Sequence, residues 1–145
     1  VIECGVFGIP PGIGNPFFDS MESILSHMIF SIPAVKGIEF GAGFDVSKKY
    51  GSENNDLYRL ENGQVHTKTN NAGGINGGLS TGMPIIFKAA FKPTPSIYKE
   101  QDTLNIKTKQ QEILKIEGRH DPCVAVRAVP VVEAATAIAI LDTIL

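Results

Sequence analysis

The chain has 145 residues, enough for one domain with a real hydrophobic core, and 43% of them are hydrophobic, which excludes a disordered protein. The net charge of −2 excludes a strong overall field toward nucleic acid or an anionic membrane, so we expect neither as a partner. The only cysteines, Cys4 and Cys123, have no CxxC or histidine partner at metal spacing, so we predict no metal site, no disulfide framework and a cytoplasmic location.

Three regular elements are expected in the first 40 residues. Residues 1–7 alternate loosely and include β-branched side chains, which predicts a strand. Apolar residues then recur at helical spacing over 17–29, with an Asp-Ser pair at 19–20 as candidate N-caps, and residues 35–40 predict a second strand. Because the chain opens on Val1, inside a strand and without an initiator Met, we interpret it as a piece of a longer protein.

The middle of the chain alternates between polar loops and one apolar strand. Residues 45–62 are polar and charged, so we expect a mobile loop with at most one helical turn, a candidate lid, with a merely solvated insertion as the alternative. Residues 64–69 predict a short strand, and residues 83–91 a buried one, covered on both faces or next to a helix. Between them, residues 70–82 hold five glycines within ten positions, which indicates either repeated positive φ or close backbone approach to a flat or anionic group, with a glycine-rich hinge as the plain alternative.

Residues 92–96, Lys-Pro-Thr-Pro-Ser, are a candidate phosphate-binding segment. Two prolines stiffen the backbone, so the lysine and the two hydroxyl groups could bind phosphate oxygens with little loss of entropy. A plain linker is the alternative. Residues 102–117 then roughly alternate between polar and apolar, which predicts one or two exposed strands with a solvated outer face.

Residues 118–123, Gly-Arg-His-Asp-Pro-Cys, are a candidate reactive loop. They place a cation, an imidazole and a carboxylate side by side, ahead of an apolar segment. Pro122 restricts the residue before it, which keeps Asp121 out of the helical backbone region. Charged triplets are commonest on solvated surfaces, so the motif alone is not specific.

The last helix is expected to begin near Pro130, with Glu133 close to the positive end of its dipole. It is apolar nearly all round to Leu145, so we expect it to be buried on most sides, between two layers or between subunits. The order of the elements predicts an α+β fold in a single domain of residues 1–145. Its antiparallel sheet should have about four strands and cover a layer of helices.

Segments along nearly the whole chain resemble the C-terminal portion of the chorismate synthase family. They include a glycine-rich segment, a flavin-contacting segment and the C-terminal signature, in the same order as in that family. The similar segments are residues 10–19, 31–39, 71–82, 92–96, 118–123 and 127–134. The family's N-terminal portion, with paired histidines, phosphate-binding arginines and an Arg-Ser-Ser flavin loop, has no counterpart in the chain.

The resemblance implies one half of a β-α-β sandwich and a shikimate-pathway enzyme. That enzyme converts 5-enolpyruvylshikimate 3-phosphate to chorismate and phosphate by 1,4-anti elimination. The family needs reduced FMN without net redox change, and is associated with NADPH and a homotetramer. By resemblance, Asp121 is the base that tunes or accepts the proton at flavin N5, and Arg119 stabilises an anionic flavin or substrate oxyanion. The implied FMN contacts are Ala34, Gly77, Lys92, Pro93, Thr94, Pro95, Ser96 and Arg119.

Three functions remain open at this point: part of a flavin-dependent lyase, an assembly module built on the terminal helix, and a phosphate-binding domain built on the glycine-rich stretch. The lyase hypothesis predicts that Asp121, Arg119, Lys92 and Gly77 converge at one edge of the sheet, around a space the size of an isoalloxazine. The chain would be less than half of such an enzyme, so we expect it to be inactive alone and not to hold FMN tightly. We also expect it to self-associate or expose an apolar patch.

Overall fold

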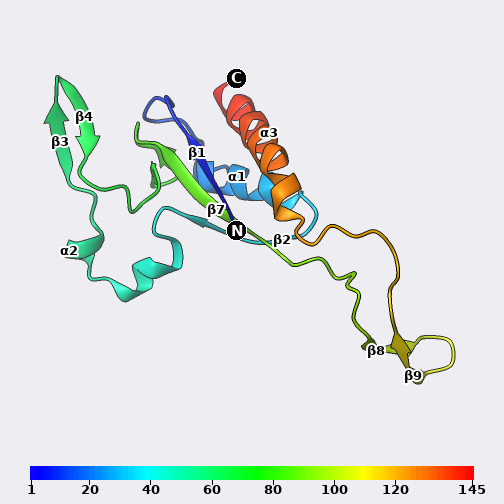
Figure 1. Cartoon of the computed structure of the whole chain (residues 1–145). Coiled ribbons are helices and arrows are strands. Elements are labelled where there is room, and N and C mark those ends of the chain that lie inside the picture. Colours follow the sequence, from blue (N-terminus) through cyan, green and yellow to red (C-terminus); the bar gives the residue numbers. More distant parts are fainter.

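A three-stranded antiparallel sheet with two helices on one face is the centre of the computed structural model, which describes all of residues 1–145 (Figure 1). The strands lie in the order β1 (Ile2–Val6), β7 (Ile85–Phe91), β2 (Val35–Phe40). Side chains of α1 (Met21–Phe30) and α3 (Ala125–Ile144) form one hydrophobic core with this sheet. The α+β prediction, an antiparallel sheet on a helical layer, is therefore confirmed.

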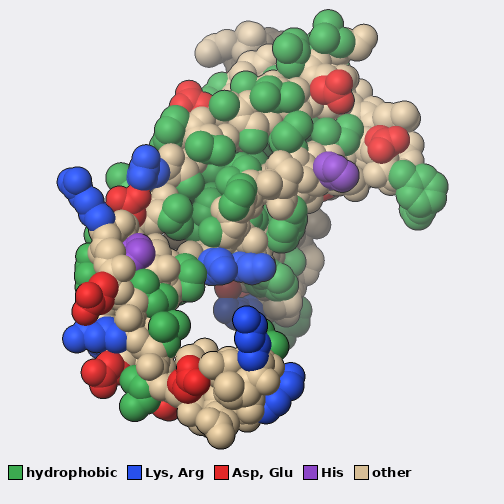
Figure 2. Space-filling model, turned by 90° about the vertical axis from the view of Figure 1, so that its right-hand side faces the viewer, with side chains coloured by type: hydrophobic (Ala, Val, Ile, Leu, Met, Phe, Trp, Pro, Cys, Tyr) green, Lys and Arg blue, Asp and Glu red, His purple; other side chains and the backbone are tan.

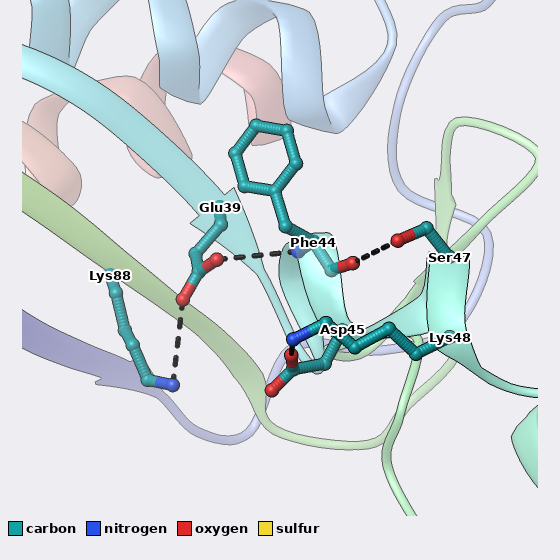
Figure 3. Close-up of polar contacts among 6 residues, drawn as sticks. All are labelled: Glu39, Phe44, Asp45, Ser47, Lys48 and Lys88. Atoms are coloured by element: carbon teal, nitrogen blue, oxygen red, sulfur yellow. Dashed lines mark hydrogen bonds and ion pairs between the residues drawn. The ribbon is translucent and has the colours of Figure 1, made fainter.

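The central strand, β7, is covered on one face only. Ile85, Phe87 and Ala89 are fully buried on the helix side. Lys88 lies on the opposite face, paired in register with Glu3 of β1 and Glu39 of β2. Its Nζ is 3.6 Å from Glu39 Oε1 (Figure 3). Of the two expected settings for this strand, the one next to a helix is found.

The main sheet has three strands instead of about four because the other strands pair locally as hairpins. Two of these hairpins are closed by the residue pairs Asn62-Gly63 and Gly77-Gly78, which all have positive φ. Positive φ at both residues is typical of the two-residue turns that match strand twist. The hairpins are β3 (Tyr58–Glu61) with β4 (Gln64–Thr67), β5 (Ile75–Asn76) with β6 (Leu79–Ser80), and β8 (Gln101–Asn105) with β9 (Gln110–Leu114).

Helix α1 begins at Met21, although the apolar residues at helical spacing already begin at Phe17. Ser20 is the N-cap, as expected for one of the two candidates, and its Oγ accepts a hydrogen bond from Ser23 N at 3.2 Å. The helix cannot include the preceding residues because Asn15 and Asp19 exchange two backbone hydrogen bonds. Phe17 therefore lies outside the helix and is largely exposed.

Residues 45–62, expected as a mobile loop with at most one helical turn, contain more regular structure than that and are anchored to the rest of the fold. They include most of the 3₁₀-helix η1 (Gly43–Lys48) and all of the short helix α2 (Gly51–Asn54). The Glu39 carboxylate accepts a hydrogen bond from Phe44 N at 3.3 Å and so ties η1 to the sheet (Figure 3). Asp56 ties the following residues to the glycine-rich segment. These anchors correct the expectation of a free lid.

Helix α3 begins at Ala125, so the predicted start near Pro130 is wrong. Val124 is the N-cap residue, and its carbonyl accepts hydrogen bonds from Arg127 N and Ala128 N, both at 3.1 Å. Within the chain only one face of the helix is covered, so the expected burial on most sides is not reached there, and burial between subunits stays a prediction. The buried residues are Ala128, Val132, Ala135, Thr136, Ala139 and Ile140. The large exposed ones are Val126, Val129, Val131, Ile138, Leu141 and Ile144.

We expect Pro130→Ala to raise the free energy of unfolding by about 1 to 2 kcal/mol. Proline inside a helix lacks the N–H that would bond to the Val126 carbonyl and crowds that carbonyl, at a cost of about 3 kcal/mol. The gain is smaller than that cost because the variant's unfolded chain is more flexible. Urea denaturation measures the change, and Pro33→Ala, outside any helix, is the control. A loss of stability in Pro130→Ala would contradict the prediction.

Candidate functional site

The proline-braced segment 92–96 begins where β7 ends, beside Ala34. Lys92 N donates a hydrogen bond to the Ala34 carbonyl at 2.8 Å. Ala34 has a φ of 74° and leads directly into β2, whose first residue pairs in register with Phe91. The structure therefore brings together two predicted FMN contacts that are far apart in the sequence.

Thr94 links this segment to the candidate reactive loop. Its Oγ1 donates a hydrogen bond to the Asp121 main-chain carbonyl at 3.1 Å. The two chain segments that meet here connect the sheet and α3 to the β8–β9 hairpin (Figure 1). Figure 2 faces this side of the molecule and shows an opening below the helices with lysine and arginine side chains around it. Ala34, Lys92, Thr94 and Asp121 thus lie at one end of the sheet.

The Asp121 side chain forms an ion pair that the sequence analysis missed. Arg127 Nη1 donates to Asp121 Oδ2 at 2.6 Å, and both side chains are more than half exposed. This hydrogen bond, followed by the charge of Asp121, raises the pKa of Arg127. Arg127 stands in the first turn of α3, so the helix presents it to the loop. Any base chemistry of Asp121 would therefore take place beside a guanidinium.

Two cations and one hydroxyl group at this end are free to bind a ligand. Lys92 and Arg119 are exposed, and the ion pairs of the chain use other cations. The Ser96 hydroxyl has no hydrogen-bond partner in the chain. The Thr94 hydroxyl, in contrast, already donates to Asp121. Lys92, Arg119 and Ser96 are therefore the available donors for an anion.

Gly77 does not join this cluster, which corrects the predicted convergence of four residues. It lies in the β5–β6 turn, before β7 begins, whereas Lys92 follows the end of β7. A seven-residue strand spans roughly 20 Å at about 3.3 Å per residue, so Gly77 and Lys92 lie at opposite ends of the sheet. Gly77 has a φ of 59°, which its turn requires whatever else it contacts.

Other glycines of the 70–82 stretch serve packing within the chain. A Cβ at Gly73 would collide with Gly41 N, and one at Gly74 would collide with the Pro84 carbonyl. One of the expected explanations, close backbone approach, therefore holds for Gly73 and Gly74. The group that approaches them is the backbone of another part of the chain. A Cβ at Gly77 would meet nothing within 4 Å.

The largest groove lies beside the glycine-rich stretch and has a volume of about 750 Å³. It is lined by residues 8–12, by part of the β3–β4 hairpin including His66, and by residues of the stretch from Asn76 to Gly82. No lysine or arginine lines it. A phosphate-binding domain built on this stretch would have to rely on backbone N–H groups and hydroxyls, without a strong cation.

No three histidine, cysteine, aspartate or glutamate side chains are close enough to share a metal ion. None of the helices combines the length and the apolar character needed to cross a bilayer.

Known proteins similar to this chain share one description. The family model described as Chorismate synthase matches residues 1–145. Chorismate synthase from Methanococcus vannielii is 50% identical over 142 residues, which are 98% of this chain and 38% of that protein. The enzyme from Dehalococcoides mccartyi is 51% identical over 142 residues, 98% of this chain and 39% of that protein. The enzyme from Chitinophaga pinensis is 50% identical over 145 residues, 100% of this chain and 43% of that protein.

A solved structure described as Crystal Structure of Chorismate Synthase has a similar fold. Its TM-score is 0.72 at 30% sequence identity, over 97% of this chain and 35% of that one. The chain thus spans 38% to 43% of the length of the three relatives compared. Since the family match runs from the first residue to the last and a solved member has the same fold, the chain belongs to the chorismate synthase family.

Proposed function

We propose that this chain is the flavin-side portion of a chorismate synthase. That enzyme is a lyase of the shikimate pathway and converts 5-enolpyruvylshikimate 3-phosphate to chorismate and phosphate by 1,4-anti elimination. The observation that supports this most is the meeting of Ala34, Lys92, Thr94 and Asp121 at one end of the sheet. These residues come from three separate parts of the sequence, and each was expected at a flavin site.

The donors at this end fit reduced FMN. Lys92, Arg119 and Ser96 offer two positive charges and a hydroxyl without competing partners, which suits a phosphate group or an anionic ring. Pro93 and Pro95 fix the backbone that carries the donors, so little entropy is lost on binding. Thr94 and Ala34 complete the contact through backbone and side-chain atoms. When bound, the reduced flavin supplies electron density to the departing C–O bond.

Asp121 and Arg119 have the catalytic roles in this proposal. Asp121 would hold or accept a proton at its carboxylate, while Arg127 keeps the carboxylate oriented. Arg119 would stabilise negative charge on the flavin or the substrate, because its guanidinium has no partner in the chain.

We propose that Gly77 contacts the flavin of a second copy of the chain. It is roughly 20 Å of strand away from Lys92, so it would contact a flavin held by a neighbouring subunit. A homotetramer would supply such neighbours. We also propose a cytoplasmic location, because Cys4 and Cys123 are free thiols. NADPH stays a candidate source of the electrons that reduce FMN.

Anaerobic titration with reduced FMN tests the proposed site. We expect Lys92→Ala and Arg119→Ala to weaken binding by about 10- to 150-fold each, the equivalent of about 1.5 to 3 kcal/mol for a charged hydrogen bond. Lys68→Ala is the matched control, because Lys68 is an exposed lysine on the segment after β4. Equal affinities for all four proteins would contradict the site. Without the remainder of the enzyme, we expect no phosphate release from substrate.

An assembly module is the second candidate, and the open face of α3 favours it. Val129, Ile138, Leu141 and Ile144 are each at least half exposed, on a helix whose other face forms the core. Such an apolar surface favours packing against another chain. Sedimentation of the intact chain measures its oligomeric state, and this result combined with the FMN titration decides between the two candidate functions. Oligomers without any affinity for FMN would favour assembly alone.

A further inference from the structure

We infer that Tyr98 and His120 are positioning residues that hold Asp121 and Arg119 beside the segment 92–96. This inference rests on the proposed function, because it assigns the purpose of the arrangement to the flavin site. Neither residue belongs to the proposed FMN contacts. Together with Thr94 and Gly118 they form what we call the clasp, which joins the two chain segments on either side of the β8–β9 hairpin.

Tyr98 and His120 contact each other and the same glycine. The Tyr98 hydroxyl donates a hydrogen bond to the Gly118 carbonyl. The rings of Tyr98 and His120 lie 5.9 Å apart at 53°. A Cβ at Gly118 would lie 3.1 Å from His120 Nε2, so glycine lets the imidazole pack tightly against the backbone. His120 Nε2 is shielded from solvent and has no hydrogen-bond partner, which indicates that packing places this ring.

The clasp is needed because the segments it joins have no regular structure. No helix or strand occurs between Phe91 and Gln101, or between Leu114 and Ala125. Asp121 and Arg119 therefore have no secondary structure to define their position relative to Lys92. The Tyr98–Gly118 hydrogen bond closes a loop between residues separated by 20 positions. Thr94 repeats the connection at Asp121.

Each contact of the clasp restricts a different part of the reactive loop. Thr94 holds the Asp121 carbonyl, and Arg127 holds the Asp121 carboxylate. Tyr98 holds the carbonyl of Gly118, just before Arg119. Because Gly118 and Arg119 are exposed, water can replace the Tyr98 hydroxyl when it is removed. The variant should therefore lose local order and keep its overall stability.

Backbone NMR relaxation in the free chain tests the clasp without any ligand. We expect Tyr98→Phe to lower the order parameters of the Arg119, His120 and Asp121 N–H groups, from about 0.85 for rigid backbone toward the values below about 0.6 of flexible backbone. Tyr58→Phe is the matched control, because Tyr58 is exposed on β3 and its hydroxyl makes no hydrogen bond in the chain. His120→Ala should have a similar effect, and His120→Phe, which keeps a ring beside Tyr98, should restore the high order parameters. Unchanged order parameters in Tyr98→Phe overturn the inference.

The absorbance spectrum of bound reduced FMN tests positioning. We expect Tyr98→Phe to change that spectrum in the same direction as Asp121→Asn, by a smaller amount, and Tyr58→Phe to leave it unchanged. Lower order parameters combined with an unchanged spectrum and affinity overturn the positioning role. A wild-type chain that binds no FMN contradicts the proposed function instead, and the order parameters alone then decide whether the clasp holds the loop.

Discussion

Gly41→Ala should lower the free energy of unfolding by about 2 to 6 kcal/mol, a large share of the stability of a small domain. Gly41 has a φ of 55°, which costs a residue with a side chain about 1 to 3 kcal/mol. An added Cβ would also collide with the Asn71 carbonyl and Gly73 N. These are backbone atoms, so they cannot rotate away as the end of a side chain could. Overpacking therefore lowers the free energy of unfolding by about 1 to 3 kcal/mol more.

The collision matters because three segments meet at Gly41. Gly41 N donates to the Ile86 carbonyl at 2.9 Å, and Ala42 N donates to the Asn71 carbonyl at 2.8 Å. Separating them would disturb the end of β2, the beginning of β7 and the glycine-rich segment together. Urea denaturation measures the change, with Gly51→Ala as the control, because a Cβ there meets nothing within 4 Å. Equal free energies of unfolding for Gly41→Ala and Gly51→Ala would contradict the prediction.

Local patterns predicted the main elements because each pattern has a local physical cause. The nearly continuous apolar run at 83–91 indicated the central strand, and Ser20 was among the predicted caps. The Asn62-Gly63 pair is a hairpin signal of the same local kind, and it explains why β3 and β4 pair with each other. The start of α3 was missed because Pro130 suits a first helical turn, whereas the helix holds it at its sixth residue in spite of the lost hydrogen bond.

The sequence predicted which segments form the candidate site, but it did not predict how those segments are arranged in space. Resemblance identified Lys92 and Asp121, but their proximity depends on the Thr94 contact across 27 positions. The Asp121–Arg127 pair could have been suspected, because an arginine in the first turn of a helix can reach back to a preceding loop. The separation of Gly77 from Lys92 follows from the length of β7, which no motif describes.

Asp56 is the anchor that keeps residues 45–62 from being a free loop. Its Oδ1 accepts hydrogen bonds from Thr69 Oγ1 at 2.6 Å and Asn71 N at 2.8 Å. Its Oδ2 accepts one from Ala72 N at 2.9 Å. Burial raises the pKa of Asp56, but these hydrogen bonds outweigh burial, so the pKa lies below its ordinary value of 3.8. The carboxylate form is therefore the one that stabilises the fold.

Asp56→Asn should lower the free energy of unfolding at neutral pH by about 2 to 4 kcal/mol. The amide oxygen can keep the contacts to Thr69 and Asn71, but the amide NH₂ would then face the Ala72 N–H, donor against donor. Asp45→Asn is the matched control in the same segment. Asp45 pairs with Lys48 at 2.7 Å on the open surface (Figure 3), and exposed pairs contribute little. The control should hardly change stability.

Acid should remove the stabilisation by the Asp56 carboxylate from the wild type. The Asp56→Asn variant has no carboxylate at this position, so acid cannot remove that stabilisation from it. Because the folded pKa of Asp56 is depressed, its stabilisation is complete above the ordinary pKa of 3.8 and is lost as the pH falls through the lower folded value. Denaturation curves from about pH 7 down to about pH 3 should therefore converge for the two proteins. Asp45→Asn should stay parallel to the wild type over most of that range. A constant difference between the wild type and Asp56→Asn at every pH would show that the Asp56 carboxylate is not the anchor of residues 45–62.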